Sequence, residues 1–291
     1  MKITYLVMAL CTALLPASEV QAQDKVAAAA AKEPAYQTVL QVPTAKTLML
    51  SDGRFVRLAG IQAPNVSRAL RPGQPYAEEA RQTLKKLVEG QQVRIEPVRK
   101  TSDHKGRMIA QVYTRDGTWV QGALLRAGAA MVYTFVDTRT YTKEMLALET
   151  EARAAQRGLW EGPYYSVLHE GNAMQGLHRF AIIEGTVQAI AEVRKTIYIN
   201  FGEDWRTDFT VVVPPKHRRQ FDMRMLQTLP GKRVRVRGWI YRKNGPSVDI
   251  SHPELIEILQ SGQGTPQTQG AVSDVSAPPA PSASSAAASG E

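Results

Sequence analysis

Cysteine is almost absent from this 291-residue chain, because its one cysteine is Cys11. A single thiol excludes a disulfide-stabilised scaffold and a Cys-based zinc site. The chain also lacks a Gly-rich phosphate loop and a nucleophile elbow. Any chemistry must therefore rest on other residue types, and the folded part must be held together by its core.

The first 22 residues are typical of a secretory signal peptide. Lys2 precedes the short apolar run "ITYLVMALCTALL", and "VQA", which ends at Ala22, fits the small-residue rule for cleavage. The run is too short to span a bilayer comfortably, and Leu10 stands before Cys11 where a lipoprotein signal needs a small residue. We expect a periplasmic or secreted protein without stable membrane insertion.

Two further segments carry few large apolar residues. Residues 23–37 are expected to form a flexible lead-in, and residues 261–291, rich in Ser, Ala, Pro and Gly, a disordered tail. The remaining length suits about two domains. Residues 36–167 hold 19 Lys+Arg against 12 Asp+Glu, and residues 168–260 hold 14 against 10. Both halves are basic, which favours anionic partners.

The first half predicts a small α+β barrel. Asp52-Gly53 and Asp116-Gly117 each join two β-like runs, as in hairpins. Apolar residues at helical spacing predict a helix over 76–88, a second over 121–132 that closes near Gly128, and a third over 142–160 that ends at Gly158.

Three motifs in this order resemble the thermonuclease family of staphylococcal-nuclease-like domains: "DGRFVRLAGIQAPN", "SDHKGRMIAQVY" and "AQRGLW". The resemblance covers residues 38–163. It implies a five-stranded OB-type barrel with three helices, in a family whose active members are calcium-dependent phosphodiesterases.

The resemblance also implies a site that is positively charged here, whereas the same site in active members of the family is negatively charged before metal binds. Arg57 and Arg107 match the family's two phosphate-binding arginines. Gln62 and Lys46 stand where the family has its metal-binding aspartates, and Asn65 stands where it has its catalytic glutamate. An amide cannot accept a proton near neutral pH, and a lysine repels a cation. The predicted site has a formal charge of +3 from its two arginines and one lysine, so we expect an anion-binding site without metal.

Other residues near these motifs leave alternatives open. Lys46 could instead point to solvent, and Asp52 is expected to be a turn residue. Asp103 is expected to cap the loop before Arg107 rather than hold metal, and His104 to be exposed. Two aromatic residues fall near the family's nucleotide site: Tyr133 is a candidate for stacking or hydrogen bonding, and Tyr113 is expected in the core.

The second half predicts a linker over 164–179 and a second OB-like β-barrel over 180–260. Three strands, a helix and two strands follow the OB order. A basic and aromatic binding face is predicted from residues that alternate along its strands: Tyr198, Arg235, Arg237, Trp239 and Tyr241, with Trp205 nearby. The alternative is that the arginines are the solvated side of an amphipathic strand.

The sequence therefore predicts an exported, catalytically inactive thermonuclease-like protein that binds nucleic acid or another acidic polymer without a cofactor. Two alternatives stay open. The first is an active calcium-dependent nuclease in which Asp52 or Asp103 replaces the missing acids. The second is an envelope scaffold that holds protein partners.

Overall fold

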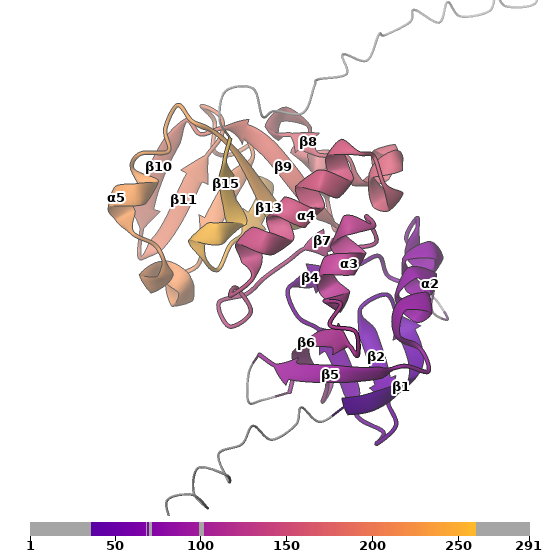
Figure 1. The fold of residues 1–291 in the computed structure, drawn as a ribbon. Coiled ribbons are helices and arrows are strands. Elements are labelled where there is room, and N and C mark those ends of the chain that lie inside the picture. The colour runs from indigo at the N-terminus through magenta and orange to yellow at the C-terminus, as the bar shows by residue number, and fades with distance from the viewer. Residues whose placement is uncertain (1–35, 68, 70–71, 99–101, 260–291) are drawn as a thin grey trace, which may run out of the picture.

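The computed structural model describes residues 36–67, 69, 72–98 and 102–259 (Figure 1). The predicted signal peptide (1–22) and tail (261–291) lie outside the described residues, as does the lead-in except for its last two residues. Those two residues belong to a strand, so the first domain begins at Tyr36 rather than at residue 38.

Five strands of the first domain close into a barrel in the order β1-β2-β3-β6-β5. The parallel pairing of β3 with β6 closes the ring, and β1 pairs antiparallel with both β2 and β5. This confirms the predicted five-stranded barrel. Its strands are β1 (Tyr36–Thr44), β2 (Thr47–Leu50), β3 (Phe55–Leu58), β5 (Gln92–Pro97) and β6 (Met108–Thr114).

Helices α2 (Ala77–Val88), α3 (Val120–Arg126) and α4 (Thr142–Ala154) accompany this barrel, as predicted. In α2 the buried positions recur at helical spacing, with Glu78 and Glu79 in the first turn and two lysines in the last. Helix α3 ends just before Gly128, as predicted, because Gly128 adopts φ 66°. A two-stranded sheet of β4 (Ile61–Gln62) and β7 (Met131–Val132) joins the turn after β3 to the chain after α3.

The second half is a β domain, as predicted, and the OB-type barrel expected for it stays a prediction. Its eight-stranded sheet has the order β10-β11-β12-β14-β13-β9-β8, with β15 also paired to β13. It has three more strands than the five expected. Two predicted strands are interrupted, one near Val187 and one by the 3₁₀ turn at Pro253. The third extra strand, β8 (Leu168–His169), comes from the segment predicted as a linker. The strands are β9 (Phe180–Thr186), β10 (Ala189–Val193), β11 (Thr196–Asn200), β12 (Thr210–Val213), β13 (Arg233–Lys243), β14 (Gly245–Asp249) and β15 (Ile256–Ile258). The predicted helix over 217–229 is broken into η4 (Pro215–Gln220) and α5 (Met223–Leu226), and Asp222 caps α5.

The segment predicted as a linker, 164–179, has structure of its own. It contains β8 (Leu168–His169), which pairs with β9, and the 3₁₀ helix η3 (Glu170–Gly176). The 3₁₀ helices η1 (Gly158–Glu161) and η2 (Pro163–Tyr165) lead into it. Leu168 and Ala173 are buried in the core of the second domain, so this segment is part of that domain.

A third apolar cluster joins the two domains. It combines Met131 and Trp160 of the first domain with Phe180 and Ile182 of β9. Figure 1 shows α4 lying against the second sheet beside β13. Because side chains from both domains share this cluster, the two domains are packed against each other rather than connected only by the chain.

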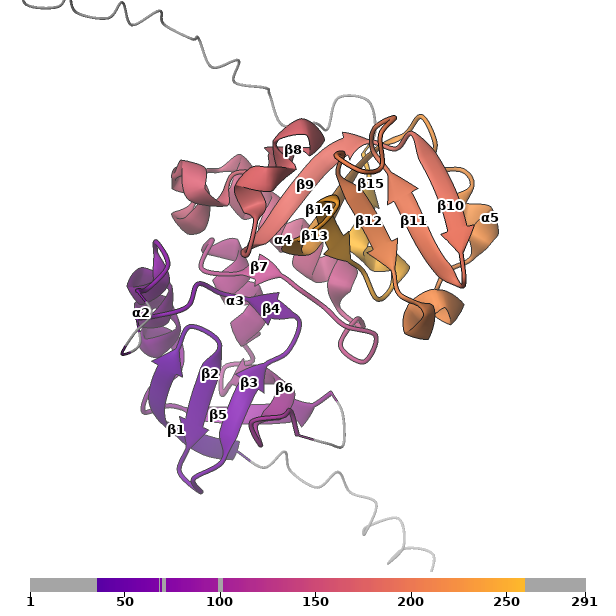
Figure 2. The same ribbon diagram turned by 180° about the vertical axis from the view of Figure 1, so that it is seen from behind.

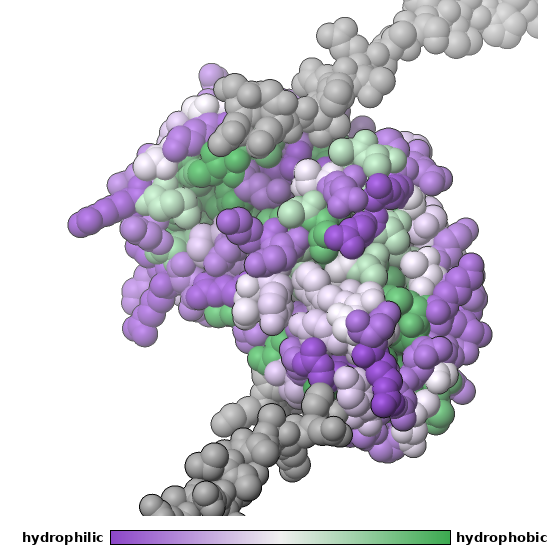
Figure 3. All heavy atoms as spheres, viewed as in Figure 1, coloured by the Kyte–Doolittle hydropathy of each residue, from purple (hydrophilic) through white to green (hydrophobic). Residues whose placement is uncertain are grey.

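The surface seen in Figure 3 is largely hydrophilic, with apolar side chains in separate patches. Among the described residues, no helix combines the length and apolar character that crossing a membrane requires.

Candidate functional site

Arg57 lies on β3 between Thr47 of β2 and Ile109 of β6. Its side chain is half-buried. Burial lowers the pKa of the Arg57 guanidinium, and the nearby charge of Arg107 lowers it further. Across the described part of the chain this guanidinium has no hydrogen bond or ion pair. Removing a cation from water without a partner is costly, so an anion brought to Arg57 would offset that cost.

Arg107 stands directly before β6, and its guanidinium is already engaged. Its Nε and Nη2 donate to Asp103 Oδ2 over 2.8 and 2.6 Å, and Nη1 donates to Thr47 Oγ1 over 3.3 Å. We call Thr47, Arg57, Asp103, Arg107 and Tyr133 the arginine site.

Asp103 caps the loop as predicted. Its Oδ1 accepts hydrogen bonds from the backbone N–H groups of Lys105 and Arg107. Burial alone would raise the pKa of Asp103, but hydrogen bonds from the side chain and backbone of Arg107, and from the backbone of Lys105, lower it to about 2. The predicted charge of +3 omitted this carboxylate, so the same residues with Asp103 carry +2.

Tyr133 directly follows β7, and its backbone N–H donates to the Gly60 carbonyl oxygen over 2.8 Å, just after β3. Burial raises the pKa of its phenol, while the charge of Arg57 acts to lower it and that of Asp249 to raise it. The phenol thus responds to the charge of a cation of the first domain and to that of a carboxylate of the second. Its ring lies against Phe135 and Phe180, with centroid distances of 4.8 and 4.9 Å.

Lys46 does not point to solvent. Its ammonium is buried and donates to the Ala63 carbonyl oxygen (3.1 Å) and to Asn65 Oδ1 (3.2 Å). Gln62 is also buried, and its Nε2 donates to the same Ala63 oxygen (2.9 Å). We call Lys46, Gln62, Ala63 and Asn65 the lysine turn. It adjoins the arginine site because Lys46 and Thr47 are consecutive.

The lysine turn does not fit the calcium ion that the resemblance implies. Calcium binds through several oxygens, preferably charged ones. Here the Ala63 and Asn65 oxygens already accept from an ammonium group, and Gln62 points its donor nitrogen, not its oxygen, into the turn. Asp103 is a carboxylate whose charge acts on Arg57, and it is bound to Arg107. Within the described residues no group of three or more His, Cys, Asp or Glu could hold a metal ion.

The remaining candidates of the first domain lie elsewhere. Asp52 is a turn residue paired with Arg54 over 2.6 Å, and His104 is exposed. Tyr113 is half-buried rather than in the core, and the guanidinium of Arg94 lies over its ring at 4.3 Å. Asp52 therefore cannot supply the acid that an active nuclease would need.

The prediction that Arg235 and Arg237 belong to a binding face of the second domain is wrong. Arg235 and Arg237 are 5% and 1% exposed, and they pair with buried acids. They are neither a binding face nor a solvated strand side, because both are buried and Arg237 is paired with Glu149 of α4. Trp239 is 39% exposed, and Tyr241 and Tyr198 are half-buried. Trp205 is exposed, with Arg206 over its ring at 4.7 Å.

The acids that pair with these arginines were not predicted. Glu149 of α4 and Glu257 of β15 both pair with Arg237, and Glu184 of β9 pairs with Arg235. A signal for Glu149 existed, since it lies four residues after buried Met145 and three before buried Ala152. An acid on the apolar side of a helix indicates a buried cation partner.

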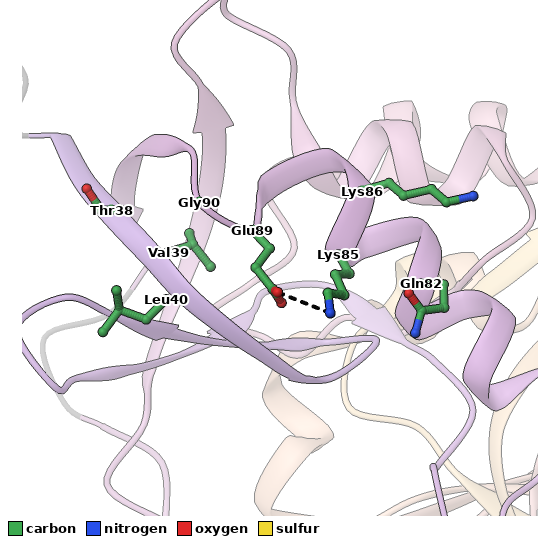
Figure 4. A pocket seen from close by; sticks show the side chains of 8 residues that line it. All are labelled: Thr38, Val39, Leu40, Gln82, Lys85, Lys86, Glu89 and Gly90. Atoms are coloured by element: carbon green, nitrogen blue, oxygen red, sulfur yellow. Dashed lines mark ion pairs between the residues drawn. The ribbon is translucent and has the colours of Figure 1, made fainter.

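A shallow groove between β1 and α2 contains none of these residues (Figure 4). Thr38 and Leu40 line one side, and Lys85 lines the other, where it pairs with Glu89 over 3.2 Å. The charges in the groove are thus partly offset, and it holds no candidate for chemistry.

Comparison with known proteins agrees with this geometry. The family described as "Staphylococcal nuclease homologue" matches residues 55–162. An "Uncharacterized endonuclease" of Escherichia coli O157:H7 is 34% identical over 125 residues, which cover 42% of this chain and 74% of that protein. The chain belongs to the staphylococcal nuclease homologue family.

Two further relatives match shorter shares of this chain and of their own length. A "Probable endonuclease LCL3" of Komagataella phaffii is 33% identical over 111 residues, 36% of this chain and 48% of that protein. A "Probable staphylococcal-like nuclease CAN1" of Oryza sativa subsp. japonica is 33% identical over 121 residues, 41% of this chain and 33% of that protein. The chain thus spans half or less of the length of these two relatives. The relationship concerns the first domain.

Proposed function

We propose that this protein is exported and binds a phosphate-bearing polymer, nucleic acid in the first place, at the arginine site without metal and without hydrolysing it. The observation that carries the proposal is Arg57, a half-buried guanidinium that makes no hydrogen bond or ion pair within the described residues. Asp103, the acid whose charge acts on it, is already bound to Arg107. Family members named as endonucleases support nucleic acid as the ligand.

In this proposal Arg57 binds a phosphate oxygen through charge-assisted hydrogen bonds. Arg107 adds a second positive charge, and Asp103 and Thr47 hold its guanidinium in place. Tyr133 offers its phenol or its ring face to the adjoining nucleotide. Lys46 is a built-in cation where the family has metal, which supports binding without calcium.

The loss of hydrolysis follows from the same residues. Activating a water molecule needs a group that accepts a proton. Asn65 cannot do so, and its oxygen is bound to Lys46. Asp103, with a pKa of about 2, is a weak base already held by Arg107.

The test is a titration of the purified protein with a fluorescein-labelled oligo(dT), in EDTA and again in calcium. We expect binding that weakens with salt, with a slope of about −0.7 per phosphate contact, and no dependence on calcium. Arg57→Ala should weaken it about ten- to a hundredfold, the range for hydrogen bonds to charged groups. Arg54→Ala, which removes an exposed arginine paired with Asp52, is the matched control.

Three results would contradict the proposal. Binding that Arg57→Ala leaves unchanged, or no salt-dependent binding at all, would remove the arginine site as its basis and favour an envelope scaffold. Cleavage in calcium that Arg107→Ala abolishes would restore the active nuclease. Export is tested separately by the N-terminal sequence of the protein recovered from the periplasm or medium, which we expect to start after Ala22.

A further inference from the structure

A line of aromatic side chains continues from the arginine site onto the second domain. Tyr133 contacts Phe135 and Phe180, and the ring of Phe180 lies 6.3 Å from that of Trp239. Figure 2 shows β7, which immediately precedes Tyr133, between β4 and the second sheet. We call Tyr133, Phe135, Phe180, Trp239 and Tyr241 the aromatic row.

The outer part of the aromatic row is open to solvent. Phe135 is 43% exposed and Trp239 is 39% exposed. Trp239 and Tyr241 share one face of β13 with Arg235 and Arg237, because side chains alternate along a strand. On that face the two arginines are buried, with Arg237 paired to α4, whereas from Trp239 onward it is accessible. Large exposed rings beside an unpaired cation suit a ligand that is flat and apolar as well as anionic.

We infer that the aromatic row is the track of a single-stranded nucleic acid, with a phosphate at Arg57 and bases stacked on Trp239 and Phe135. This rests on the proposed function and extends it from a phosphate site to a polymer path over both domains. Single strands expose base faces that a duplex hides, and aromatic side chains stack on them with little sequence preference.

An acid, Asp249, lies within this track and gives the inference a further test. The Tyr241 phenol donates to Asp249 Oδ1 over 2.5 Å, and Asp249 is exposed. Asp249 also pairs in register with Val212, next to Tyr198. Its charge should oppose the backbone of a passing strand. Asp249→Asn keeps an acceptor for Tyr241 and removes the charge, so it should tighten binding about two- to fivefold, the range of a surface charge interaction.

The experiment compares two fluorescein-labelled probes on the intact protein, a thymidine dinucleotide and an oligo(dT) of about 15 nucleotides, which exceeds a typical OB-fold site. Trp239→Ala and Phe135→Ala should each weaken binding of the long probe at least about fivefold and leave the dinucleotide unchanged. Trp239→Phe should restore most of the loss. Trp205→Ala, which removes another exposed tryptophan outside the row, is the matched control.

The outcomes separate this inference from the function on which it rests. If Arg57→Ala weakens both probes while the Trp239 and Phe135 variants bind like the parent, the track is refuted and the arginine site stands. If the parent binds neither probe, both proposals fail. Equal dependence on Trp239 for a duplex, or for heparin, would overturn single-stranded nucleic acid as the ligand.

Discussion

Arg237 of β13 donates from Nη1 to Oε2 of Glu149 in α4 over 2.6 Å, and both side chains are fully buried. Glu149 also accepts from the backbone N–H of Val132 through its other oxygen, over 2.8 Å. Arg237 is further bound to Glu257 of β15. Through Glu149, this ion pair connects α4 and β7 of the first domain to the sheet of the second domain. Tyr133 directly follows β7 in the chain.

The first prediction concerns this pair. Arg237→Ala leaves Glu149 buried with a weaker partner, Arg153 at 3.5 Å. We expect a loss of about 3–5 kcal/mol in the free energy of unfolding, as for one partner removed from a buried pair. Urea denaturation followed by circular dichroism measures it. The double variant Arg237→Met with Glu149→Leu should regain much of the loss, and exposed Arg206→Ala should cost under about 1 kcal/mol.

The second prediction concerns pH. The pKa of Asp103 is about 2 in the folded protein against an ordinary value of 3.8. The unfolded chain therefore binds more protons between these values, so this stabilisation is present above about pH 4 and is lost as the pH falls through 2. Asp103→Asn should be less stable than the parent at pH 7, and the difference should shrink towards pH 2. A constant difference across that range would contradict the strength of the Asp103–Arg107 pair.

The third prediction restores the missing acids. Lys46→Asp, Gln62→Asp and Asn65→Glu together remove the internal ammonium and place three carboxylates at the lysine turn. We expect calcium binding by calorimetry, absent in the parent, and calcium-dependent cleavage of single-stranded DNA. Adding Arg57→Ala should lower cleavage by about a hundredfold or more while calcium still binds. A folded triple variant that binds no calcium would show that the turn does not have the geometry of active family members.

The fourth prediction distinguishes two costs of replacing a glycine: the strain of a positive φ and the steric overlap of an added Cβ. Gly117 and Gly128 both have positive φ, 86° and 66°. A Cβ at Gly117 would meet nothing within 4 Å, whereas one at Gly128 would lie 2.0 Å from the Arg157 carbonyl oxygen. Gly117→Ala should cost about 1–2 kcal/mol for the left-handed backbone. Gly128→Ala should cost about 1–3 kcal/mol more, from steric overlap. Equal thermal melting temperatures of the two variants would refute the close approach.

Sequence patterns predicted the structure correctly where that structure depends on residues close together in the chain. The Asp-Gly turns, the apolar face of α2 and the loop cap at Asp103 follow from hydrogen bonds and spacing within a few residues. The motifs around Arg57 and Arg107 were enough to predict the family and the closed barrel. The family match also placed Tyr133 near Arg57, although their positions are far apart in the chain.

What the sequence could not determine is which surfaces the two domains hide from water. Side chains alternate along β13, which predicts that Arg235, Arg237, Trp239 and Tyr241 share a face. The alternation does not reveal that the two arginines on that face are buried, with Arg237 paired to α4. Lys46 became an internal cation only because the turn at Ala63 brings two oxygens to it. The chain alone determined the barrel, the family and the two arginines. Only the tertiary structure decided that Arg107 is neutralised while Arg57 is not, because pairing and burial depend on residues that are distant in sequence.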